Sequence, residues 1–67
     1  MANLRIKELR ISKNIQQKAL AELLGVSPRT IRIWESGKYE PSIDQLISIA
    51  NILGVSIDYL VGRTDKK

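Results

Sequence analysis

The chain has 67 residues with eleven basic and seven acidic side chains, a net charge of +4, and it contains neither cysteine nor histidine. This length allows one small domain, and the missing residue types exclude a disulfide framework, a cysteine zinc site and histidine-based acid–base chemistry. No apolar run approaches the ~20 residues of a membrane span and no signal-peptide segment opens the chain, so we expect a cytoplasmic protein.

The positive charge is concentrated in the first half of the chain. Residues 1–38 carry a net charge of +5, whereas residues 39–67 carry −1. This asymmetry favours an anionic partner for the first half, with nucleic acid as the leading class. The alternative is that the charge serves solubility alone, because many small domains are mildly basic.

Helical spacing of the apolar residues, without strand-like alternation, predicts an all-α domain of five short helices. The first helix is expected over residues 3–13, with Ile6 and Leu9 facing inward and Asn14 as a left-handed cap. The second is expected over residues 17–24. Its start is poorly signalled because Gln16 is a weak N-cap.

The third helix has the clearest start in the chain. Ser27 is a favoured N-cap and Pro28 occupies the first helical position, where proline is also favoured. The helix is expected to run to about Glu35 and to stop at Gly37. Ile31 and Trp34 form its inward side; a role for Trp34 in stacking on unpaired bases is the weaker alternative.

The last two helices are predicted from residue 42 onward. Ser42 and Gln45 form a capping-box pattern ahead of an apolar stripe that ends before Gly54. Ser56 then caps a final short helix. We expect a domain over residues 1–62 and a polar tail over residues 63–67. The apolar residues are Leu46, Ile49, Ala50 and Leu53 in the fourth helix, and Ile57, Leu60 and Val61 at the last one.

Residues 17–36 together predict a helix-turn-helix. Ala21 is small enough to let another helix cross closely, Gly25 opens a tight turn, and Val26 fills the angle between the helices. Ile31 and Trp34 then pack the second helix onto the first. Two helices joined at a steep angle by a short glycine-containing turn are typical of this motif.

The second helix of this motif retains a free face. Arg29, Arg32, Ile33 and Ser36 lie at positions i, i+3, i+4 and i+7. A guanidinium fork matches the O6 and N7 acceptors of guanine, and an isoleucine beside two cations suits a thymine methyl group. Backbone N–H groups after Ser27 suit a phosphate. The alternatives are a solvated face for the arginines and a place at the core margin for Ile33.

The sequence resembles the XRE/Cro–repressor family of helix-turn-helix regulators. The matching pieces, in order, are "IKELR", "ALAELLGVS", "TIRIWESGK", "EPSIDQLISIANILGVS" and "IDYLVGRTD", which together cover most of residues 4–65. The resemblance implies a compact five-helix Cro/repressor-like domain with its helix-turn-helix at about residues 17–36.

The resemblance also implies roles for single residues. Gln17 matches a glutamine that holds a phosphate, and Lys38 matches a basic residue that contacts the DNA backbone. Arg10 and Glu35 match a structural pair between the first and third helices, either on the surface or partly buried. The positions that match the recognition helix and its start are Ser27, Pro28, Arg29, Arg32, Ile33 and Ser36. Pro28 departs from the family pattern, since it offers neither a side-chain donor nor an N–H.

The expected function is therefore sequence-specific binding of double-stranded DNA by a small bacterial or phage transcriptional regulator that acts as a repressor. It would be nucleoid-associated when bound, without a cofactor, a metal or a small-molecule ligand. A homodimer, with Ile57, Leu60 and Val61 as its expected contact, would recognise an inverted-repeat operator. The alternative is a protein-interaction module, either an antitoxin or an adaptor. An enzyme is not expected, because the chain has no catalytic histidine, cysteine or phosphate-binding glycine loop.

Overall fold

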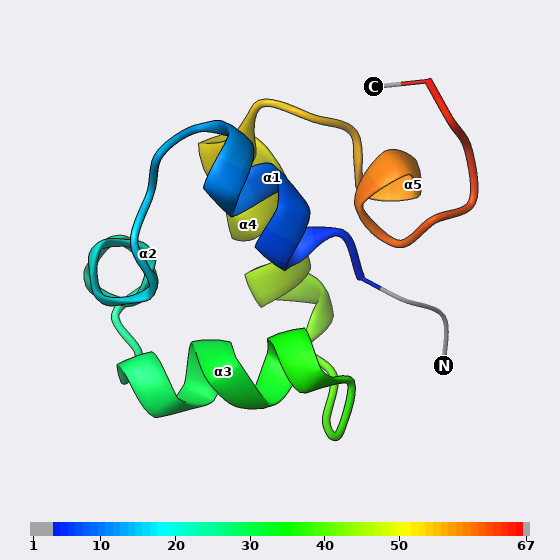
Figure 1. Cartoon of the computed structure of the whole chain (residues 1–67). Coiled ribbons are helices and arrows are strands. Elements are labelled where there is room, and N and C mark those ends of the chain that lie inside the picture. Colours follow the sequence, from blue (N-terminus) through cyan, green and yellow to red (C-terminus); the bar gives the residue numbers. More distant parts are fainter. Residues whose placement is uncertain (1–3, 67) are drawn as a thin grey trace.

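Five α-helices and their short links make up the computed structural model, which describes residues 4–66. No strand occurs in this range, so the predicted all-α class with five helices is confirmed (Figure 1). The start predicted for the first helix at residue 3 lies outside the described residues. The helices are α1 (Ile6–Ser12), α2 (Gln17–Leu24), α3 (Pro28–Ser36), α4 (Ile43–Leu53) and α5 (Ile57–Leu60).

The predicted helix caps are present. The Ser27 hydroxyl oxygen accepts a hydrogen bond from the Thr30 N–H, and Ser42 and Gln45 form the reciprocal capping box. Gly37 ends α3 with a φ of +80°, a left-handed conformation that glycine adopts without steric cost. Asn14 is the one non-glycine residue with positive φ among the described residues, as expected for a cap after α1.

The core lies where the apolar stripes of the helices meet. Trp34 is only 5% exposed, so the prediction that it belongs to the core is confirmed. The largest fully buried side chains are Ile6, Leu20, Ile31, Ile49, Leu53 and Leu60.

No helix within residues 4–66 has the length and apolar character needed to cross a membrane.

The C-terminal part differs from its sequence-based description. Leu60 is fully buried as expected, but Tyr59 is buried as well, whereas Ile57 is 38% exposed. The tyrosine was not predicted in the core because its polar hydroxyl and the short helix gave no periodic signal.

The Arg5 guanidinium lies 4.2 Å from the centre of the Tyr59 ring and 3.1 Å from an Asp65 oxygen. Tyr59, and to a smaller extent Asp65, raise the pKa of Arg5.

Candidate nucleic-acid interface

α2 and α3 form the predicted helix-turn-helix. Figure 1 shows α2 end-on and α3 running across the lower edge of the molecule, so the two helices cross steeply. Gly25 makes the turn in the left-handed conformation, and its N–H and that of Val26 bond to carbonyls of the last turn of α2. Leu20 and Ala21 of α2 are buried with Ile31 and Trp34 of α3, which leaves the opposite face of α3 open.

The open face of α3 contains a shallow hollow of about 240 Å³. We refer to it as the α3 hollow, and its lining consists of Arg29, Arg32, Ile33 and Ser36, the four residues predicted to face base edges. Arg29, Arg32 and Ser36 are exposed, whereas Ile33 is partly buried between them. An apolar side chain therefore lies between two cations on an otherwise accessible surface.

Ser36 makes its hydrogen bonds within the protein. Its hydroxyl donates to the Ile33 carbonyl oxygen at 2.7 Å and accepts from the backbone N–H of Lys38 at 3.3 Å. The serine thus joins the last turn of α3 to the loop that follows. In this arrangement the hydroxyl hydrogen of Ser36 is not available to a base. The bond to the N–H of Lys38 helps to fix the backbone at that residue.

The cations of this region are not neutralised by nearby acidic groups. Within residues 4–66, Arg29, Arg32 and Lys38 form no ion pair at 4.0 Å or less, and all three are exposed. The Lys38 ammonium lies 5.9 Å from the centre of the Tyr39 ring, which is itself 64% exposed. The end of α3 and its loop therefore present unscreened positive charge beside an accessible tyrosine.

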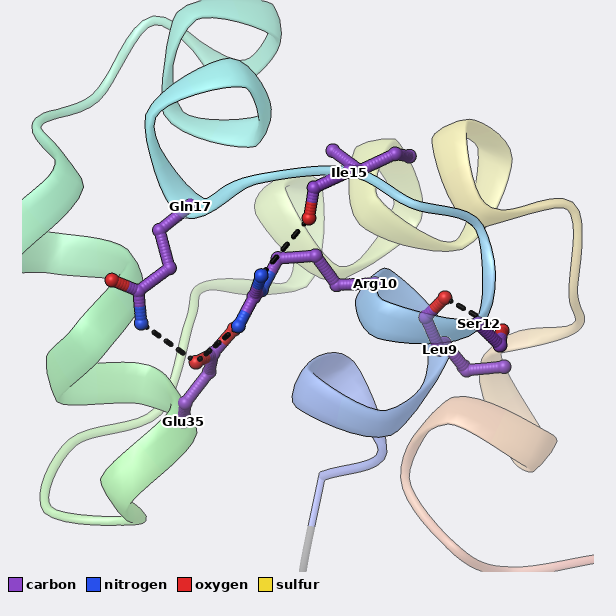
Figure 2. Close-up of polar contacts among 6 residues, drawn as sticks. All are labelled: Leu9, Arg10, Ser12, Ile15, Gln17 and Glu35. Atoms are coloured by element: carbon purple, nitrogen blue, oxygen red, sulfur yellow. Dashed lines mark hydrogen bonds and ion pairs between the residues drawn. The ribbon is translucent and has the colours of Figure 1, made fainter.

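Glu35 stands at the centre of a buried polar network that connects three helices (Figure 2). Its carboxylate accepts from Arg10 Nε at 2.7 Å, from Arg10 Nη2 at 3.4 Å and from Gln17 Nε2 at 2.9 Å. Arg10 Nη1 also donates to the carbonyl oxygen of Ile15 at 2.9 Å. The side chains of Arg10 and Glu35 are 11% and 5% exposed, so the expected pair forms in its buried version.

The bond from Gln17 to Glu35 was not anticipated from the sequence. The resemblance indicated a phosphate contact for Gln17, and a contact 18 positions away leaves no periodic signal. One amide hydrogen of Gln17 is used by this bond, and the other remains at the start of α2. The network thus holds Gln17 in place relative to α3.

Ser27 and Pro28 occupy the N-terminus of α3 as predicted. The Ser27 hydroxyl accepts the capping bond from the Thr30 N–H and also lies 3.0 Å from the Thr30 hydroxyl. Both contacts stabilise the start of α3. Pro28 is exposed at the first helical position and offers only its ring carbons to a partner.

The residues expected at a dimer contact are not equally accessible. Leu60 has no exposed surface, so of the three predicted residues only Ile57 and the partly buried Val61 reach the outside. Ile43 and Ile47 of α4 are 70% and 41% exposed and were not singled out from the sequence. They lie one turn apart, next to the buried stripe of that helix.

The chain is similar in sequence to proteins with a helix-turn-helix. The profile of a family described as Helix-turn-helix matches residues 6–60. The SPbeta prophage-derived uncharacterized HTH-type transcriptional regulator YonR of Bacillus subtilis is 40% identical over 90% of this chain and 56% of its own length. The chain spans about half the length of YonR and of several other HTH-type regulators from that species.

Two kinds of solved structure resemble the fold. The P22 c2 repressor protein, crystallised in complex with a synthetic operator, has a TM-score of 0.80 and 37% identity over 85% of this chain and 86% of that chain. Hydroxypropylphosphonic acid epoxidase from S. wedmorenis has a TM-score of 0.77 and 40% identity, but the match covers only 30% of the enzyme and 84% of this chain. The fold therefore also occurs as a minor part of an enzyme.

Proposed function

Because this chain belongs to the XRE-type helix-turn-helix family, we propose that it is a sequence-specific double-stranded DNA-binding transcriptional regulator that inserts α3 into the major groove. The observation that carries this proposal is the α3 hollow, in which two exposed guanidiniums flank a partly buried isoleucine on the open side of the motif. Guanidinium groups suit guanine edges, and an aliphatic group suits a thymine methyl.

The remaining contacts divide by role. Arg29, Arg32 and Ile33 would contact base edges, whereas Gln17, Lys38 and the backbone N–H groups at Ser27 would hold phosphates. The free amide hydrogen of Gln17 and the exposed ammonium of Lys38 support this division. Affinity should then fall steeply as salt rises, because each phosphate contact releases counterions.

We further propose that the protein acts as a homodimer on an inverted-repeat operator and represses transcription. Two helix-turn-helix units read half-sites about 34 Å apart, one helical turn of DNA. The likeness to a repressor crystallised on a synthetic operator supports this mode of action. Action on chromosomal or phage DNA would place the protein in the cytoplasm, associated with the nucleoid when bound, and requires no cofactor.

The alternative function is that of a protein-interaction module, as in an antitoxin or adaptor. In that case the face formed by Arg29, Arg32 and Ile33 would bind a protein. Addition of random duplex at low salt separates the two functions, since only DNA binding shifts the amide resonances of α3. An antitoxin that also binds DNA would show the same shift and would be identified by its captured partner.

Selection of binding sites from a random duplex pool tests the proposal. Purified protein at moderate salt should enrich an inverted repeat whose half-sites lie one helical turn apart. Enrichment of a single unrepeated site would retain sequence-specific binding and reject the dimer. A pool that stays random, despite binding at low salt, would mean that the positive face provides only non-specific attraction.

A further inference from the structure

The side chains on the open face of α3 differ in whether they donate or accept hydrogen bonds. Arg29 and Arg32 are donors only, and Ile33 has no polar atom. Pro28, at the start of the helix, has neither a side-chain donor nor a side-chain acceptor. The side-chain acceptors of α3 are therefore the hydroxyl oxygens of Thr30 and Ser36 and the carboxylate of Glu35.

Each of these three groups already forms hydrogen bonds within the protein, and the Thr30 hydroxyl lies 3.0 Å from the Ser27 hydroxyl. The Glu35 side chain is 5% exposed, and its two carboxylate oxygens receive three hydrogen bonds from Arg10 and Gln17. Figure 2 shows that it points toward α1 and the start of α2. The Ser36 oxygen already accepts from Lys38, and its hydrogen is donated to Ile33. Tertiary contacts have thus removed the acidic residue from the recognition surface.

The four bases respond differently to such a surface. In the major groove guanine offers two acceptors, O6 and N7, and thymine offers the O4 acceptor and a methyl group. Adenine and cytosine present the amino groups N6 and N4, which need an acceptor on the protein, and in adenine this amino group lies beside the N7 acceptor. A donor left without a partner in an interface costs free energy, so a surface of donors and apolar groups disfavours these amino groups.

We propose that α3 makes its direct base contacts to guanine and thymine only, with Arg29 and Arg32 on guanine and Ile33 in contact with the thymine methyl. This inference rests on the proposed function and adds the class of base that is read. The contacted bases of each half-site would be keto bases, and no direct hydrogen bond would go to the N6 of adenine or the N4 of cytosine.

Base analogues in the selected operator test the inference directly. Replacing a contacted guanine by 7-deazaguanine, which lacks N7, should weaken binding by at least about tenfold. Replacing the contacted thymine by uracil should weaken it about fourfold, the value for one buried methyl group. Replacing adenine by unsubstituted purine, or cytosine by 2-pyrimidinone, removes the amino group. These replacements should change affinity by less than about twofold, after correction with the same replacement outside the half-sites.

A change of preference provides the second test. Ile33→Gln adds an acceptor and a donor to the α3 hollow, and glutamine pairs with the N6 and N7 of adenine. The variant should select adenine at the position where the unmodified protein selects thymine. Ile11→Gln is the matched control, because Ile11 is 56% exposed on α1 and lies outside the hollow. It should keep the original preference.

The outcomes separate this inference from the proposed function. If no duplex is selected at all, the proposed function fails before the base class is tested. If an operator is selected but removal of an amino group from adenine or cytosine weakens binding tenfold, α3 does use an acceptor and the inference is wrong. Loss of affinity with 7-deazaguanine and uracil alone supports it.

Discussion

Glu35 shows at the scale of a single residue how the fold assigns a role that its position in the sequence does not reveal. It follows Trp34 on the recognition helix, one residue before Ser36 of the open face, yet its carboxylate is buried against Arg10 and Gln17. A buried charge is stable only when it is paired and hydrogen-bonded. The residue therefore serves to hold α3, and the proposed base contacts fall to other residues of the helix.

Removing this carboxylate should destabilise the protein strongly. Glu35→Ala leaves the Arg10 guanidinium buried without its partner, which costs about 3 kcal/mol or more in the free energy of unfolding. The double variant Arg10→Met/Glu35→Leu removes both charges and should lose much less. Urea titration followed by circular dichroism measures both values. Equal losses in the two variants would contradict the role of the ion pair.

Substitutions of the exposed cations outside this network should distinguish residues that set sequence preference from residues that contribute only general affinity for DNA. Arg29→Ala should reduce the binding free energy for the selected operator by about 1–3 kcal/mol, if the side chain forms two hydrogen bonds to one guanine. It should also relax the preference at that base position. Lys38→Ala should weaken selected and random duplexes alike and lower the salt slope by about 1. Titrations at several salt concentrations measure both effects. Identical behaviour of the two variants would reject the division into base and phosphate contacts.

At the scale of the element, α2 and α3 are started in different ways. Ser27 caps α3 with its hydroxyl, whereas Gln16 makes no capping bond to α2 although its backbone is in the extended conformation of an N-cap. The difference was visible in the sequence, because serine favours this position and glutamine does not. The start of α2 is therefore held by the Gln17–Glu35 contact and by packing.

A better cap should strengthen α2. Gln16→Ser supplies a short hydroxyl at a position with φ −75° and ψ 156°, and should add about 1 kcal/mol to the free energy of unfolding. Gln16 is exposed, so the exchange removes little packing. Thermal denaturation measures the gain, with Ser42→Ala as the converse change that should cost about 1 kcal/mol. An unchanged midpoint for Gln16→Ser would mean that the helix start is already satisfied by water.

The whole molecule combines a small core with exposed apolar residues away from the α3 hollow. A core of this size gives limited stability, and association of two copies is one way to increase it. Leu60 is fully buried in the core, which leaves Ile57 and the partly buried Val61 as the accessible members of the expected contact. Any dimer must form through the residues that the monomer leaves uncovered.

A charge at this surface should affect the dimer and spare the monomer. Ile57→Glu should reduce binding to an inverted repeat while leaving affinity for a single half-site and the unfolding free energy nearly unchanged, because the residue is 38% exposed. Binding titrations on one and two half-sites, together with sedimentation at several concentrations, give the comparison. Equal effects on both duplexes would place the dimer contact elsewhere.

Much of this protein follows from local sequence rules. Periodic apolar residues, serine caps and glycine stops determined the five helices and the face that contains Arg29, Arg32, Ile33 and Ser36, because these signals act within a few residues of the chain. The tertiary structure alone decided that Glu35 and Gln17 bond to each other, that Tyr59 is buried, and that Leu60 is unavailable to a partner. Those outcomes depend on contacts between distant segments, and such contacts leave no periodic pattern in the sequence.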